Sequence, residues 1–153
     1  MTPCIFAEQL DRTVTKAGTY RCNSPECDGD HTFSRTSNVF RLADGREVDG
    51  SRDLPPGAVY FAPILADFLC PHEPTCAEHL HAVCPNGRHW DVDSRASNCT
   101  LPDDAKHRCW VRHGNPRQPS SLHVDKDGFT CAAGAGSIQA GDYHGFLAHG
   151  AFT

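Results

Sequence analysis

Six of the fifteen residues from Cys70 to Cys84, CPHEPTCAEHLHAVC, are cysteine or histidine. The whole chain carries nine cysteines and ten histidines. Metal binding, disulfide bonding and thiolate–imidazole chemistry all use these residue types. An odd number of cysteines together with many histidines favours metal ligation over a complete disulfide framework. We therefore expect a fold that is held together partly by sulfur and imidazole ligands.

The remaining composition favours a small fold rich in strands and turns. A chain of 153 residues corresponds to one domain, or to one domain with a small appendage. Hydrophobic residues make up 39% of it, below the roughly 45–50% of ordinary globular chains. Glycine (13) and proline (11) are plentiful, which favours short strands over long helices. Such a small core would need reinforcement.

The charge and hydropathy pattern disfavours two classes of partner. The formal net charge of −5 provides no overall attraction to a phosphate backbone, so nucleic-acid binding is not expected. No stretch approaches the ~20 apolar residues of a membrane-spanning helix. The first residues also lack the basic segment and apolar run of a secretory signal. We expect a soluble protein that makes no membrane contact.

The chain divides by composition into a Cys/His knuckle-like N-terminal segment, residues 1–37, and a β-rich core domain, residues 38–153. In the first segment, TYRC (19–22) and HTF (31–33) predict two short strands around the turn-forming sequence NSPECDGD. The fold class predicted is mostly β: a small, compact, hairpin-rich domain with a Cys/His-stapled N-terminal knuckle.

Several hairpins are predicted within the core domain. Asp44-Gly45 would turn one hairpin, and Asn86-Gly87 would join HLHAVC (79–84) to RHWDVD (88–93). One face of that second hairpin would meet the core, while the other displays histidines and acids. Further strands are expected at 58–62, within 108–114, in a hairpin over 121–131, and in short pieces of the glycine-rich end; residues 64–69 are open to strand or helical turn.

A first candidate metal site combines Cys22, Cys27 and His31, with Cys4 as a candidate fourth ligand. Zinc takes four sulfur or nitrogen ligands in a tetrahedron, and two thiolates on one turn supply half of them. The gap of four residues between the cysteines lies at the wide end of the usual range. The alternative is a disulfide, or inert thiols on a turn.

A second candidate zinc site draws three thiolates from Cys70, Cys76 and Cys84. One imidazole would complete it, from His72, His79 or His81, and we take His79 as the ligand. Packed or oxidised thiols are the alternative.

The last three cysteines and the known catalytic motifs give weaker signals. Cys99, Cys109 and Cys131 have no spacing that fixes a metal geometry, so buried thiols or a disulfide are the simpler interpretation. The chain lacks the zinc-deaminase, zincin, G-x-S-x-G and P-loop patterns. We therefore predict no catalytic and no organic-cofactor residues, although a Cys–His nucleophile pair assembled in space stays open.

Three blocks carry a resemblance to a known family: DSRASNCTLPDD, HRCWVRHG and VDKDGFTCAAGAGSIQAGDYHGFL. They resemble a family of small proteins of uncharacterised function encoded by tailed bacteriophages and prophages. The similarity extends over about the last two-thirds of the chain, from LPPGAVYFAP onward. The segment from Cys4 to His31 lies outside it, so the first metal site depends on spacing alone. The resemblance implies synthesis in the bacterial cytoplasm and residence in a phage particle.

These observations lead to an expected function. The chain would be a non-enzymatic virion component, a capsid decoration or cement protein or else a neck or tail accessory subunit, stabilised by zinc or disulfides. Its partners would be capsid or tail proteins in a symmetric assembly. The alternatives are an intracellular phage zinc-binding adaptor that acts on a host partner and, third, a metal-dependent hydrolase.

Overall fold

The computed structural model describes the chain except for residues 28, 63–78, 97–98, 102, 105–108 and 127–135. Strands make up 53% of the described residues and helical turns 5%, so the prediction of a mostly β fold is confirmed. The two helical segments are single 3-10 turns, η1 (Ser51–Asp53) and η2 (Pro119–Ser121). Proline begins the second turn, where its missing N–H costs no hydrogen bond.

The larger sheet has six strands in the order β4-β3-β2-β5-β6-β7. All neighbours are antiparallel except β2 and β5, which run parallel through Ile5–Ala58 and Phe6–Val59. The bounds of these strands are β2 Ile5–Arg21, β3 Asp30–Leu42, β4 Glu47–Asp49, β5 Ala58–Ala62, β6 His79–Val83 and β7 His89–Asp91.

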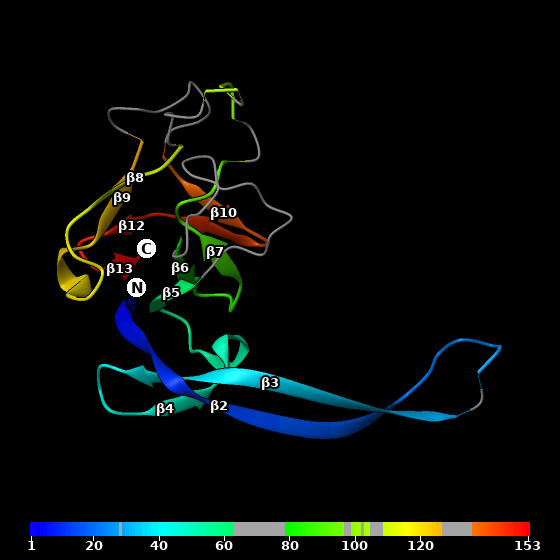
Figure 1. Cartoon of the computed structure of the whole chain (residues 1–153). Coiled ribbons are helices and arrows are strands. Elements are labelled where there is room, and N and C mark those ends of the chain that lie inside the picture. Colours follow the sequence, from blue (N-terminus) through cyan, green and yellow to red (C-terminus); the bar gives the residue numbers. More distant parts are fainter. Residues whose placement is uncertain (28, 63–78, 97–98, 102, 105–108, 127–135) are drawn as a thin grey trace.

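The second sheet has five short strands in the order β1-β13-β12-β9-β8, and β10 and β11 form a separate two-stranded ribbon. The pairing of β1 with β13 brings Thr2 opposite Phe152, so both ends of the chain lie side by side in the body (Figure 1). The bounds are β1 Thr2–Pro3, β8 Val111–His113, β9 His123–Asp125, β10 Ile138–Ala140, β11 Tyr143–Gly145, β12 Leu147–Ala148 and β13 Ala151–Phe152.

Two clusters of buried side chains form the core of the body. The larger cluster joins β5 and β6 to the second sheet and includes Leu80, Leu122, Ile138, Leu147 and Phe152, none of which has measurable exposure. The smaller cluster lies at the root of β2 and β3 and contains Phe40, Leu42 and Tyr60. Burying such side chains is the main favourable contribution to folding.

Both predicted Gly-containing turns of the larger sheet are confirmed. Gly45, with a φ of 94°, lies in the turn between β3 and β4, where Phe40 pairs with Val48. Gly87, with a φ of 82°, lies between β6 and β7. Positive φ angles are accessible to glycine at little cost, which is why these turn sequences predicted the hairpins. The strand over 58–62 is confirmed as β5.

Other expectations are met only in part. The strand expected within 108–114 is shorter, β8, and Cys109 and Trp110 precede it, both buried in the larger core cluster. The prediction that the second hairpin displays its histidines on the face away from the core was wrong for His79, which lies in β6 and is fully buried. The glycine-rich end forms short strands, as expected. The segment 64–69 and the turn at 126–128 lie wholly or mostly outside the described residues.

The strands predicted at 19–22 and 31–33 are parts of a much longer hairpin. The antiparallel ladder of β2 and β3 runs outward from the Ala7–Leu42 pair to the Arg21–Asp30 pair. The expected segment boundary after residue 37 therefore falls inside β3. Three residues of β2, Leu10 to Arg12, lie opposite the single residue Val39, which is a bulge-like irregularity. Irregularities of this kind bend a strand pair.

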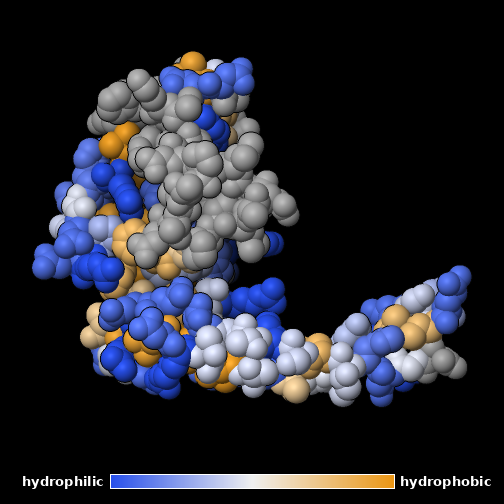
Figure 2. Space-filling view, in the orientation of Figure 1, coloured by the Kyte–Doolittle hydropathy of each residue, from blue (hydrophilic) through white to orange (hydrophobic). Residues whose placement is uncertain are grey.

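Beyond this irregularity the hairpin leaves the body as an arm, here defined as residues 13–21 and 30–38 with the connecting loop. The arm gives the molecule an L shape (Figure 1). None of the residues 13–21 or 30–38 is buried. Figure 2 shows a mostly polar arm with a small apolar area near its far end. At the root, Glu47 pairs with Arg12 and Arg41, and Lys16 pairs with Asp49 at 3.6 Å.

Candidate metal centre

Three of the predicted ligands meet at the far end of the arm. Cys22 directly follows β2, Cys27 closes the connecting turn, and His31 is the second residue of β3. The backbone N–H of Cys27 donates to the Ser24 carbonyl oxygen at 3.1 Å, which closes the turn that contains Pro25. Proline and serine favour such turns, and the turn returns Cys27 toward the end of the ladder.

The ligand atoms of Cys22, Cys27 and His31 all lie within 4.8 Å of one another. The shortest approach is between Cys27 Sγ and His31 Nε2, at 3.0 Å. Both cysteines are half-buried. Among the described residues this is the only such group of Cys, His, Asp or Glu side chains, and it could hold a metal ion. The three residues that the sequence spacing grouped as candidate ligands therefore do lie close together in space.

The imidazole of His31 is positioned by the ladder itself. Tyr20 is its cross-strand partner, and the two rings stack with centroids 5.4 Å apart and planes at 28°. Phe33 follows on the same face, 6.5 Å from Tyr20. Cys22 lies one residue beyond the end of β2, and its Sγ is within 4.8 Å of the ligand atoms of Cys27 and His31. The pairing of β2 with β3 thereby sets the relative positions of the ligand side chains.

Tyr20 and Phe33 support the ligand set without having been predicted from the sequence. Phe33 pairs with Gly18 across the ladder, and a Cβ placed on Gly18 would lie 2.7 Å from the Phe33 ring. The ring thus covers a glycine that would otherwise leave a gap in the strand face. An alternation of glycine, tyrosine and cysteine at 18, 20 and 22, opposite phenylalanine and histidine at 33 and 31, was the available signal.

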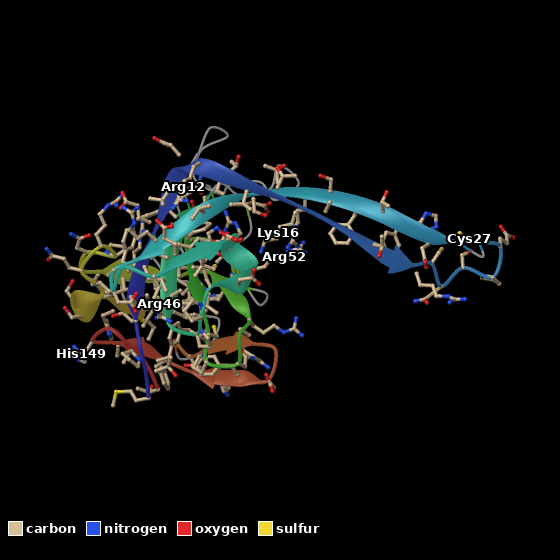
Figure 3. All side chains as sticks on the ribbon, turned by 90° about the horizontal axis from the view of Figure 1, so that it is seen from below. Arg12, Lys16, Cys27, Arg46, Arg52 and His149 are labelled. Atoms are coloured by element: carbon tan, nitrogen blue, oxygen red, sulfur yellow. The ribbon has the colours of Figure 1, made fainter. Side chains whose placement is uncertain are left out.

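Cys4 is not the fourth ligand, which corrects the expectation for the first site. Cys4 precedes β2 and Cys22 follows it, so the two are separated by a 17-residue strand whose extended length is at most roughly 55 Å at ~3.3 Å per residue. Figure 3 places Cys27 at the end of the arm far from the body. The backbone N–H of Cys4 donates to the Gly150 carbonyl at 2.7 Å, and its side chain packs against the larger core cluster.

The second predicted site is only partly described. Cys70, Cys76 and His72 lie outside the described residues. Cys84 packs in the larger core cluster with Leu80 and Ala82. Because faces alternate along β6, His79 and His81 point to the opposite side, away from Cys84. His79 is fully buried, with Nδ1 3.4 Å from Asp91 Oδ1. Cys84 and His79 are therefore not brought together.

Cys84 instead lies near Cys4. Burial raises the pKa of Cys4 to about 12, and the charge of Cys84 adds to that effect. Burial alone raises the pKa of Cys84 to about 11. In the absence of a metal, both thiols are consequently protonated at neutral pH. None of the six described cysteines forms a disulfide.

The third cysteine set also belongs to the core where it is described. Cys109 is buried in the larger cluster, and Cys99 packs against it at the surface. Cys99 Sγ accepts from the Leu101 backbone N–H at 3.4 Å. Cys131 lies outside the described residues. Cys99 and Cys109 are therefore thiols packed in or against the core.

Comparisons of the chain with protein-family models, with curated proteins and with solved structures gave no match. Within the described part of the chain, no helix has the length and hydropathy of a membrane span. The fold and the Cys22–Cys27–His31 group are therefore the features of the chain that bear on its function.

Proposed function

We propose that the chain is a non-enzymatic structural subunit of a bacteriophage particle, and that it attaches to neighbouring subunits through its arm. The observation that carries this proposal is the arm itself. Residues 13–21 and 30–38 form backbone ladder pairs only with each other among the described residues, and none of them is buried. The phage setting rests on the resemblance of the blocks between Asp93 and Leu147.

An arm of this kind makes physical sense when a partner covers it. A two-stranded ribbon alone is only marginally stable in water, because one pair of strands buries little surface. Among the described residues, no strand pairs with either outer edge of the arm, and a strand of a neighbouring subunit can add to such an edge. Near its end the arm also exposes two large aromatic side chains, Tyr20 at 54% and Phe33 at 45%. Aromatic residues are enriched at protein interfaces.

We further propose that the end of the arm holds zinc. Two thiolates and one imidazole are the ligand types that zinc prefers, and they come from a single turn and the strand after it. Closing this turn with a metal would stabilise the end of a ribbon that lacks a core of its own. Three side chains also leave one of four tetrahedral positions for a further ligand, such as water or a side chain of the bound subunit.

Purified particles provide the test. The phage that encodes the chain is grown with the natural sequence or with the double variant Tyr20→Ser/Phe33→Ser, and density-purified particles are analysed by mass spectrometry. We expect the natural chain in the particles and a loss of at least tenfold in the variant, because a few aromatic side chains carry much of the energy of an interface. The matched control is Thr32→Ser, which alters the opposite face of β3.

Absence of the natural chain from particles, despite its presence in the lysate, would contradict the proposal and favour an intracellular adaptor. An adaptor uses the same arm on a host partner, and it is synthesised early in infection. Equal incorporation of the natural chain and the double variant would also contradict the role assigned to the arm. Tryptophan fluorescence of the purified variant establishes that its body is folded.

A further inference from the structure

A hollow of about 510 Å³ lies in the angle where the arm meets the body. One side is formed by β3 and the η1 segment, and the other by β5 and β6. This volume falls within the ~300–1,000 Å³ typical of small-molecule sites. Its lining includes two arginines, three side chains with rings of Phe, Tyr or His, and one serine: Arg35, Arg52, Phe40, Tyr60, His81 and Ser37.

The hollow has an excess of positive charge. Arg35 and Arg52 form no ion pair with any described residue. The acidic residue in the lining, Asp49, is already paired with Lys16 at 3.6 Å. Figure 3 shows Arg52 at the root of the arm, on the side of Lys16. Because Arg35 and Arg52 have no carboxylate partner among the described residues, their planar guanidinium groups are left to bind phosphate or carboxylate through two hydrogen bonds each.

The inner wall of the hollow is aromatic. The rings of Tyr60 and His81 stack with centroids 5.2 Å apart and planes at 17°, and Phe40 meets Tyr60 edge-on at 5.5 Å. The Tyr60 hydroxyl is satisfied by His89 Nδ1 at 2.7 Å. His81 Nε2, in contrast, is buried and has no hydrogen-bond partner among the described residues.

We propose that this hollow binds a small ligand in which a phosphate or carboxylate is joined to a planar ring. The guanidinium groups of Arg35 and Arg52 bind the anionic group, and Ser37 adds a neutral hydrogen-bonding group beside them. The ring packs against the wall formed by Phe40, Tyr60 and His81. This inference does not depend on attachment of the arm to a particle.

Isothermal titration of the full chain with four probes tests the proposal. The probes are adenosine monophosphate, 4-hydroxybenzoate, adenosine and inorganic phosphate. We expect saturable binding of at least one of the two ring-bearing anions, with adenosine and inorganic phosphate each at least tenfold weaker. Tighter binding of adenosine monophosphate identifies phosphate as the recognised group, and tighter binding of 4-hydroxybenzoate identifies carboxylate.

Variants locate the binding. Arg52→Ala and Arg35→Ala should each weaken the better probe by about tenfold or more, because each removes a charged hydrogen-bonding partner. Arg46→Ala is the matched control, since Arg46 is exposed, pairs with Asp44 and does not line the hollow. Failure of both anions to bind, equal binding of adenosine or inorganic phosphate, or insensitivity to both arginine variants would overturn the proposal. Urea unfolding followed by tryptophan fluorescence checks that each variant is folded.

Discussion

Tyr20 and His31 face each other across the end of the β2–β3 ladder, with ring centroids 5.4 Å apart and planes at 28°. The stacked tyrosine restricts the imidazole to the orientation in which its Nε2 lies 3.0 Å from Cys27 Sγ. The ladder therefore aligns the ligand set before any ion binds. Residues that orient metal ligands in this way commonly affect affinity strongly when they are replaced.

Tyr20→Ala should weaken zinc binding at the arm by about tenfold, within the ~10–100-fold range for residues that orient ligands. Tyr20→Phe keeps the stacked ring and should bind zinc as the natural chain does. Competition with a chromophoric chelator measures both affinities. Equal affinity of the alanine variant and the natural chain would show that the stacking has no orienting role.

Zinc should protect the arm from proteolysis without changing the stability of the body. Metal binding adds its free energy only to the folded form of the segment that supplies the ligands. Limited trypsin digestion can be followed at Lys16, Arg21 and Arg35, which all lie in the exposed arm. We expect cleavage there to slow when zinc is added and to recover with chelator. In the Cys22→Ser/Cys27→Ser variant, zinc should have no effect at these three positions.

The body and the arm should respond separately to a mutation in the core. Leu122 has no measurable exposure and packs in the larger cluster, so Leu122→Ala should lower the free energy of unfolding by about 2–5 kcal/mol. Trp110, which is 8% exposed in the same cluster, reports that unfolding by fluorescence. Under conditions where the variant is still folded, its zinc affinity at the arm should be unchanged. A large loss of affinity would mean that the two parts are coupled.

The thiols of Cys4 and Cys84 should react slowly with iodoacetamide at pH 8 in the folded protein and quickly in urea. Burial raises the pKa of these thiols to about 12 and about 11, from an ordinary value of 9.0, and the thiolate is the reactive form. Peptide mass spectrometry after timed labelling measures both rates. Equal rates in the folded and unfolded protein would contradict this assignment.

The same pKa values predict how stability varies with pH. A thiol whose pKa is raised on folding stays protonated in the folded chain, while the unfolded chain ionises above pH 9. The stabilising effect is therefore fully present below about pH 9 and is lost as the pH rises toward 11 and 12. Urea midpoints between pH 8 and pH 10.5 should fall less in Cys84→Ala than in the natural chain.

The sequence predicted the turns of the body better than the length of the arm. Asp44-Gly45 and Asn86-Gly87 specify hairpins through local φ preferences, so they could be identified without knowledge of the rest of the fold. The arm gives no such signal, because neither face is buried and hydrophobic alternation is absent along DRTVTKAGTY. Its β-branched threonines and valine were the remaining indication of a strand.

The candidate metal site was predictable where its ligands are close in sequence. Cys22, Cys27 and His31 share one turn, so their spacing was informative. The role of Cys4 could not be judged in the same way, because it depends on the length of β2. Cys84 and His79 are five residues apart, but strand alternation places them on opposite faces. Arg35 and Arg52 are brought to one hollow by the bend at the arm root, which no local pattern encodes.

The most direct test of the account is the cobalt spectrum of the purified chain. Cobalt(II) replaces zinc in tetrahedral sites, and thiolate ligands give it an intense near-ultraviolet charge-transfer band. We predict that Cys22→Ser/Cys27→Ser removes one equivalent of cobalt and the band that belongs to it, while Cys4→Ser leaves both unchanged. A double variant that binds as much cobalt as the natural chain, with the same spectrum, would contradict the claim that the end of the arm is a metal centre.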